Sequence, residues 1–95
     1  AKGAVAALDK ANISHGVGKD VIVMGFDCNK WALEELLAGN WNYDGQCNPF
    51  QASYIDSIIK DLENGTSPAN KVIIMDEKGF DASTITQEDV DKYGI

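Results

Sequence analysis

The fold is decided by one stretch in the first third of the chain, Val21-Ile22-Val23-Met24-Gly25-Phe26-Asp27-Cys28-Asn29-Lys30. Its opening run is apolar and mostly β-branched, without the alternation of a half-exposed strand, which predicts a strand covered on both faces, as in a parallel sheet. The glycine and polar residues that follow predict a turn. Leucines on one face of residues 30–38 predict a helix, which Gly39 is placed to end. This order is the βα unit of α/β folds, so we expect parallel strands flanked by helices.

The flanking sequence continues this pattern of strands and helices. An alanine-rich segment at residues 3–11 predicts a helix whose start lacks a capping side chain, so we expect further sequence upstream of it. Apolar residues recur at helical spacing from Pro49 to Leu62, which predicts an amphipathic helix capped by Asn48. The other predicted elements are a short strand within residues 40–47, a buried strand at residues 71–75 and a capped closing helix at residues 87–93.

Size and charge restrict the classes of function. The chain has 95 residues, 44% of them hydrophobic, which is enough for one small domain with a modest core. Fifteen acidic residues against eight basic ones give a formal charge of −7, which opposes binding to nucleic-acid backbones and to anionic membranes. No apolar run approaches the roughly 18 residues of a membrane span. We therefore expect a globular domain that does not bind nucleic acid.

Polar side chains gather where two predicted strands end, at Asp27-Cys28-Asn29 and at Gln46-Cys47-Asn48. Ligands of open α/β sheets bind at the carboxyl ends of strands, where loops and helix N-termini converge. A carboxylate accepts hydrogen bonds from adjacent hydroxyls, and a carboxamide both donates and accepts. Trp31 and Trp41 lie near these ends in sequence, and aromatic rings can cover the apolar face of a sugar. The sequence therefore indicates a site for a polyhydroxylated ligand.

Each of these residues also has a purely structural alternative. Asp27, Asn29 and Asn48 are residue types that cap helices, and the two tryptophans can be packing residues. Cys28 and Cys47 both fall near strand ends, so they can form a disulfide or remain two free buried thiols.

No arrangement of residues supports catalysis or a cofactor. The sequence has no Ser/His/Asp spacing, no paired carboxylates with a base, no glycine-rich phosphate loop and no metal cluster. Gly16-Val17-Gly18 lacks the preceding strand that a dinucleotide motif requires. His15 is the one histidine; it lies in a different loop from Cys28, and we expect it to be solvated. We therefore expect a binding protein and not an enzyme, with neither metal nor cofactor.

Five segments, in order, resemble the type I periplasmic sugar-binding proteins of ABC importers, the ribose and galactose binding group. GKDVIVMGFD at residues 18–27 is similar to the family's KDV-x-V-x-GFD segment, and QCNPF at residues 46–50 to its NP or ECNP element. The other three segments are ALEELLAG at 32–39, LENGTSP at 62–68, and FDAS at 80–83, which is similar to the ending of the ECNP-bearing branch. The match covers nearly the whole chain, and the ordered set is what makes it specific.

The resemblance implies a two-lobed, Rossmann-like fold of which this chain is the C-terminal portion. In that family, the lobes exchange strands through a hinge. The resemblance assigns residues 1–47 to the second lobe, residues 48–78 to a segment that crosses to the first lobe, and residues 79–95 to a return segment. Because most of the cleft would come from other residues, we expect the chain alone to bind sugar weakly or not at all.

The resemblance also implies a site and a function. The acid of GFD contacts the sugar in this family, and it falls on Asp27. The residue before the NP element is often a glutamine that faces the cleft; here it is Cys47, so Gln46 or Asn48 is expected to supply the amide. The implied function is the capture of a monosaccharide or related polyol by a parent protein that is periplasmic, or extracellular and anchored to the membrane. Hinge closure and docking on an ABC permease follow. The further partner is the remainder of the parent chain, or a swapped or self-associated oligomer.

Two other functions remain open. A sugar-responsive transcription repressor has an effector domain with this fold and the GFD element, but the acidic charge and the transporter-like segment ALEELLAGNWNYDGQ oppose it. If the chain is a self-contained flavodoxin-like module, we expect a well-folded monomer. If the chain is instead part of a larger protein, we expect self-association or another polypeptide to cover the apolar residues Ile55, Ile58, Ile59 and Leu62.

Overall fold

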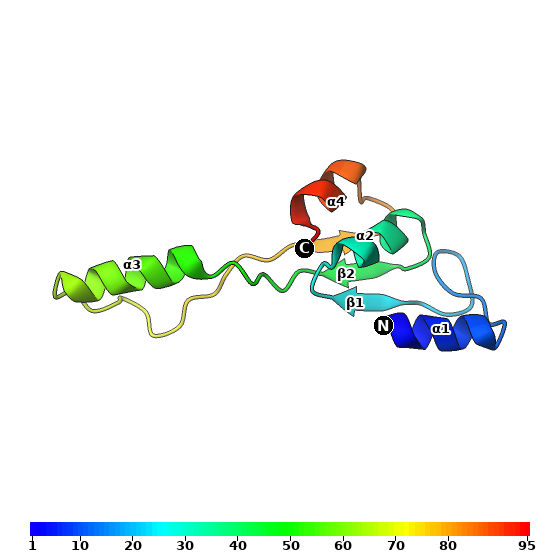
Figure 1. The fold of residues 1–95 in the computed structure, drawn as a ribbon, viewed down its shortest axis with the longest axis horizontal. Coiled ribbons are helices and arrows are strands. Elements are labelled where there is room, and N and C mark those ends of the chain that lie inside the picture. Colours follow the sequence, from blue (N-terminus) through cyan, green and yellow to red (C-terminus); the bar gives the residue numbers. More distant parts are fainter.

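A small mixed sheet organises the structure, a computed structural model that describes all residues from Ala1 to Ile95. In chain order, the elements are α1 (Lys2–Lys10), β1 (Met24–Phe26), α2 (Lys30–Leu37), β2 (Tyr43–Gly45), α3 (Ala52–Glu63), β3 (Gly79–Asp81) and α4 (Gln87–Tyr93). Helices α2 and α4 lie together on one side of the sheet, and α3 stands far from the sheet (Figure 1). α1 lies near α2, with Lys2 Nζ 4.7 Å from the centroid of the Trp31 ring.

The molecule has a sheet part, residues 1–47 and 79–95, and an arm, residues 48–78, that carries α3 (Figure 1). The two segments at the base of the arm run side by side, since the Gln46 amide donates to the Lys78 carbonyl at 2.8 Å. The predicted assignment of these parts to two lobes stays a prediction.

The strand order is β1-β2-β3. β1 and β2 are parallel, with Met24 opposite Tyr43 and Phe26 opposite Gly45, and α2 is the crossover between them. β3 pairs antiparallel with β2, and a Cβ on its Gly79 would lie 2.0 Å from Tyr43 Oη, so a larger residue there would require the Tyr43 side chain to move. Parallel pairing brings the carboxyl ends of β1 and β2 to the same edge, where the polar segments behind them meet.

The core lies between the sheet and helices α2 and α4. Leu33 and Leu36 of α2 and Val90 of α4 are fully buried, and Trp41 and Phe80 are nearly so. Burial of a large apolar side chain contributes about 1.5–3 kcal/mol relative to its exposure. The remaining core residues are Val23, Cys28, Ala32 and Ile85. Parallel strands with flanking helices confirm the predicted α/β class.

Three helices form close to where local signals predict them. α1 spans Lys2–Lys10, and its N-cap residue makes no side-chain capping bond. α2 ends shortly before Gly39, which has the left-handed φ of 79° typical of a residue behind a helix. α4 matches the predicted range, with Thr86 and Asp89 forming a capping box. None of the helices has the length and apolar character needed to cross a membrane.

The first strand is shifted and less covered than predicted. β1 spans Met24–Phe26 instead of residues 21–24. Ile22, Met24 and Phe26 are 69%, 63% and 71% exposed, whereas the alternate residues Val23 and Gly25 are buried. The prediction of a strand covered on both faces was wrong for this chain, because helices pack against only one face of the sheet.

α3 projects away from the sheet and buries none of its residues. The molecule therefore measures 61 × 25 × 17 Å. Ile55, Ile59 and Leu62 are 51%, 49% and 57% exposed, which leaves the apolar face of α3 in solvent. This arrangement disagrees with the alternative of a self-contained flavodoxin-like module, in which the sheet buries helices on both faces.

Two predictions about the arm were wrong. α3 begins only at Ala52, and Asn48 does not cap it; instead, Asn48 Oδ1 accepts a hydrogen bond of 2.9 Å from the Phe50 amide. Residues 71–75 form no strand, and Ile74 is 88% exposed. The reason is that a strand needs a neighbour for its backbone hydrogen bonds, and none of the three strands lies beside this segment.

Candidate functional site

A strained turn follows β1. Residues 26–29, called here the Asp27 turn, contain two consecutive non-glycine residues with left-handed backbones, Asp27 at φ 90° and Cys28 at φ 52°. Such conformations cost on the order of 1–3 kcal/mol each and persist only where the surroundings enforce them. Here the Asp27 amide donates to the Gly45 carbonyl at 2.8 Å, and the Ile95 amide donates to the Cys28 carbonyl at 3.0 Å. The turn is therefore fixed from both β2 and the C-terminus.

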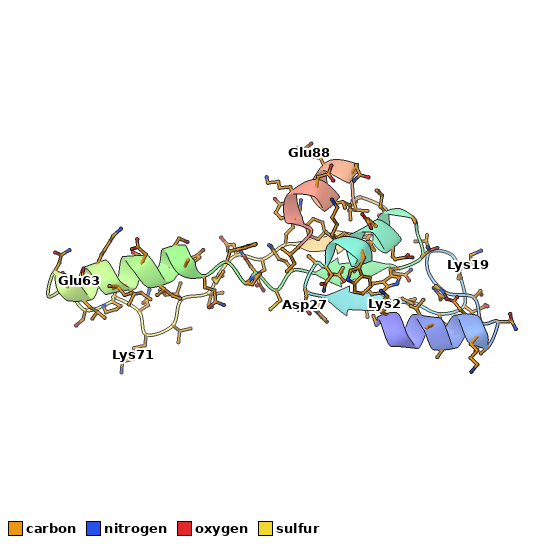
Figure 2. The ribbon with its side chains drawn as sticks, viewed as in Figure 1. Lys2, Lys19, Asp27, Glu63, Lys71 and Glu88 are labelled. Carbon is orange, nitrogen blue, oxygen red and sulfur yellow. The ribbon has the colours of Figure 1, made fainter.

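The Asp27 turn opens onto a groove of about 340 Å³ at the carboxyl ends of β1 and β2. Figure 2 shows Asp27 at the end of β1, near the base of the arm. The Asp27 side chain is exposed and takes part in none of the salt bridges of the structure. Its carboxylate is therefore free to accept hydrogen bonds from a ligand. The groove is also lined by Gln46, Cys47, Asn48, Phe50 and Tyr93.

The two carboxamides of the groove are held by the backbone in similar ways. Gln46 Oε1 accepts from the Lys78 amide at 3.1 Å, and Asn48 Oδ1 accepts from the Phe50 amide at 2.9 Å. Because their oxygens are engaged, the amino groups of Gln46 and Asn48 remain as donors. The groove thus combines a free carboxylate acceptor with two amide donors, a set suited to a ligand with adjacent hydroxyls.

The structure brings four predicted site residues together and separates two. Asp27, Gln46, Cys47 and Asn48 line one groove, whereas Asn29 and Trp31 do not. Asn29 occupies the N-cap position of α2 without a side-chain capping bond. The Trp31 ring instead packs edge-on against Trp41, with ring centroids 5.6 Å apart, and Lys2 Nζ lies 4.7 Å from its centroid. Trp31 is therefore a packing residue of the α1–α2 junction, and the aromatic residues that line the groove are Phe50, which is 70% exposed, and Tyr93.

Of the two alternatives for the cysteines, a disulfide or two free thiols, the structure has the second, since Cys28 and Cys47 are both free. Both residues line the groove, but Cys28 is buried in the core beside Asp44 whereas Cys47 is exposed. Burial, together with the charge of Asp44, raises the pKa of the Cys28 thiol to about 12. Cys28 is therefore an inert thiol at neutral pH.

Asp44 was not identified from the sequence. It is the one charged residue that is fully buried, and its Oδ1 accepts from the Cys28 amide at 2.9 Å, while Oδ2 has no partner. Burial raises the pKa of the Asp44 carboxyl, and the hydrogen bond from the Cys28 amide opposes this rise. The sequence signal was an acid within a short strand between Tyr43 and Gly45, where β-propensity disfavours it.

His15 is not the solvated residue that its loop position predicted. Its side chain is only 12% exposed, with Nε2 lying 2.9 Å from Asp9 Oδ1 and Nδ1 lying 3.0 Å from the Asn40 carbonyl. The hydrogen bond to Asp9 is the main reason that the pKa of His15 is raised, and the Asn40 carbonyl adds to this effect. No group of three or more His, Cys, Asp or Glu residues is placed to hold a metal ion.

Comparison with known proteins identifies the fold. No family model matches the sequence, and no curated protein does. Among solved structures, a galactofuranose-binding protein matches 96% of this chain, with a TM-score of 0.77 and 22% identity. A Mycobacterium smegmatis protein, solved in complex with β-D-fucofuranose, matches 85% of the chain, with a TM-score of 0.69 and 23% identity. A further structure from Mycobacterium smegmatis matches the same share, with a TM-score of 0.71.

The chain spans only 26–30% of the length of these proteins. At 22–23% identity, the similarity establishes the fold, which is that of one part of each of these longer proteins. This agrees with the α/β fold class expected from the sequence, including the expectation that the chain is a portion of a larger fold.

Proposed function

We propose that this chain is the C-terminal part of an extracytoplasmic solute-binding protein that captures a monosaccharide or related polyol for import by an ABC transporter. The protein acts by reversible binding and not by catalysis, in the periplasm or anchored at the outer face of the membrane. Its partners are the sugar, an ABC permease and the polypeptide that completes the cleft. The similarity in fold to part of a galactofuranose-binding protein supports this proposal.

The observation that carries the proposal is the position of the Asp27 carboxylate. It stands at the carboxyl end of a parallel strand, exposed in a groove and held there by a left-handed backbone. Strain of this kind in a non-glycine residue is concentrated at functional sites, where the direction of a side chain is what the fold preserves. Ligands of α/β sheets bind at this same edge.

The chemistry of the groove fits a sugar. The Asp27 carboxylate accepts from two adjacent hydroxyls, and the amino groups of Gln46 and Asn48 donate to hydroxyl oxygens. The exposed ring of Phe50 at the groove can cover the apolar face of a sugar ring. The chain supplies one wall of the site, so its affinity on its own is expected to be on the order of 1 mM or weaker, about −4 kcal/mol.

The test is a titration of the isotope-labelled chain with D-galactose, D-fucose and D-ribose, followed by the backbone amide signals in NMR spectra. Signals of Asp27, Gln46 and Asn48 are expected to shift together. Asp27→Asn keeps the size and shape of the side chain but loses the charged acceptor, which weakens binding by about 10- to 100-fold. The matched control Asp61→Asn, on the exposed surface of α3, leaves the titration unchanged.

A chimaera tests whether the missing wall is what limits affinity. The 95 residues replace the matched segment of the galactofuranose-binding protein, and sugar binding is measured by calorimetry. The chimaera is expected to bind more tightly than the chain alone, with the same dependence on Asp27. Micromolar affinity of the chain alone contradicts the expectation of weak binding, and the absence of binding in both proteins contradicts the proposed function.

A further inference from the structure

We propose that Asp44 is a positioning residue that holds the Asp27 turn in its left-handed conformation and thereby directs the Asp27 carboxylate into the groove. The role of Asp44 in holding the turn stands on the structure of the turn. Its consequence for ligand binding rests on the proposed function.

The Asp44 side chain reaches the turn by crossing the neighbouring strand. Asp44 lies opposite Gly25 in the parallel ladder, and a Cβ on Gly25 would lie 2.6 Å from Asp44 Oδ2. The Trp41 ring would lie equally close to it, also at 2.6 Å. The φ of Gly25 is not in the left-handed region, so the glycine is needed for space. An absent side chain on β1 thus lets a carboxylate from β2 pass over the strand to the Cys28 amide.

The Asp44 side chain contacts a residue whose left-handed conformation has to be stabilised. Asp44 Oδ1 accepts from the Cys28 amide at 2.9 Å, and Cys28 is the second of the two left-handed residues. The Asp27 amide is bound one residue further along β2, to the Gly45 carbonyl at 2.8 Å. Adjacent residues of β2 therefore hold adjacent amides of the turn, one with a side chain and one with the backbone.

Burial of the Asp44 carboxylate opposes folding, so its place in the core indicates that its contact has a structural role. Asp44 is completely buried, and Oδ2 has no hydrogen-bond partner. An unsatisfied buried polar atom costs about 1–3 kcal/mol, and few occur in a native structure. The Cys28 amide, which would otherwise be an unpaired buried donor in a strained turn, is what the carboxylate satisfies. This explains why an acid occupies the centre of a strand that packs against the core.

The experiment observes the turn directly, without a ligand. In the wild-type chain, a scalar coupling across the hydrogen bond should connect the Cys28 amide nitrogen with the Asp44 side-chain carbon. Asp44→Ala should speed hydrogen exchange of the Cys28 amide by about 10-fold, the factor for one lost hydrogen bond. The backbone coupling constant of Asp27 should move away from its left-handed value. Asp44→Asn keeps the acceptor and should restore both within about 3-fold.

Leu36→Ala is the matched control, since Leu36 is as fully buried as Asp44 but lies in the last turn of α2. It destabilises the core and should accelerate exchange generally, without a selective effect at Cys28. The proposal is overturned if the cross-bond coupling is absent in the wild type, which requires no variant to fold, or if Asp44→Ala leaves Cys28 exchange and the Asp27 coupling constant unchanged. The same variants, placed in the chimaera and titrated with D-galactose, add a measurement of binding. Absence of sugar binding in both the wild-type chain and the wild-type chimaera counts against the proposed function alone, because hydrogen exchange still decides the role of Asp44.

Discussion

Replacing Asp27 by glycine should stabilise the chain while removing the proposed ligand contact. Asp27 has φ 90°, where a side chain is disfavoured by about 1–2 kcal/mol and glycine is not. The greater conformational freedom of glycine in the unfolded chain reduces this gain in stability by about 0.5–1 kcal/mol. The expected net gain is therefore about 0.5–1 kcal/mol. For a chain of 95 residues, this raises the thermal midpoint by about 2–8 °C.

The assay is thermal unfolding followed by circular dichroism, with Asp27→Ala as the decisive comparison. Both variants lack the carboxylate, so the difference between them isolates the backbone term, and we expect Asp27→Gly to be the more stable by about 1 kcal/mol. Asn12→Gly is the matched control at another left-handed position, φ 56°, and should change stability little because asparagine tolerates this region.

The reasoning is refuted if Asp27→Gly is no more stable than Asp27→Ala, because the turn would then be unstrained. The proposed ligand contact also requires that sugar-induced NMR shifts are lost in both Asp27→Gly and Asp27→Ala. Stability gained at the expense of binding is the trade-off expected where strain serves function.

Two further predictions concern the sheet part and the arm. The pKa of His15 is raised from 6.5, mainly by Asp9, so its contribution to stability is complete below pH 6.5 and is lost as the pH rises through the raised pKa. The thermal midpoint should fall over that interval in the wild type relative to His15→Gln, and parallel pH profiles would contradict the assignment. The exposed apolar face of α3 should drive self-association. Light scattering should show a mass that increases with concentration, and the double variant Ile55→Lys, Ile59→Lys should abolish this increase; a monomer at all concentrations would count against it.

Prediction from sequence succeeded where the signals are local. The helices α1, α2 and α4 follow from apolar spacing, from Gly39 and from the Thr86 cap, all within a few residues of the element they define. The gathering of Asp27, Gln46 and Asn48 followed from one rule, that parallel strands end at a common edge. That rule needs only the order of the elements.

Prediction failed where a residue's role depends on what lies beside it. Residues 71–75 have the composition of a buried strand but have no strand beside them, and their β-propensity is not realised. Trp31 is near the site in sequence, yet its place on α2 directs it towards Trp41 instead of the groove. Cys28 and Cys47 were expected either to form a disulfide or to be free and buried; both are free, but only Cys28 is buried and Cys47 is exposed.

The sequence by itself determined the βα unit, the helices and the strand ends at which Asp27 and the amides stand, because these features arise from interactions among near neighbours in the chain. Only the tertiary structure revealed that Gly25 provides space for Asp44 and that Asp44 reaches the Cys28 amide 16 residues away. Those contacts depend on the register of β1 against β2, which is set by packing of the whole sheet part and leaves no pattern in either segment alone.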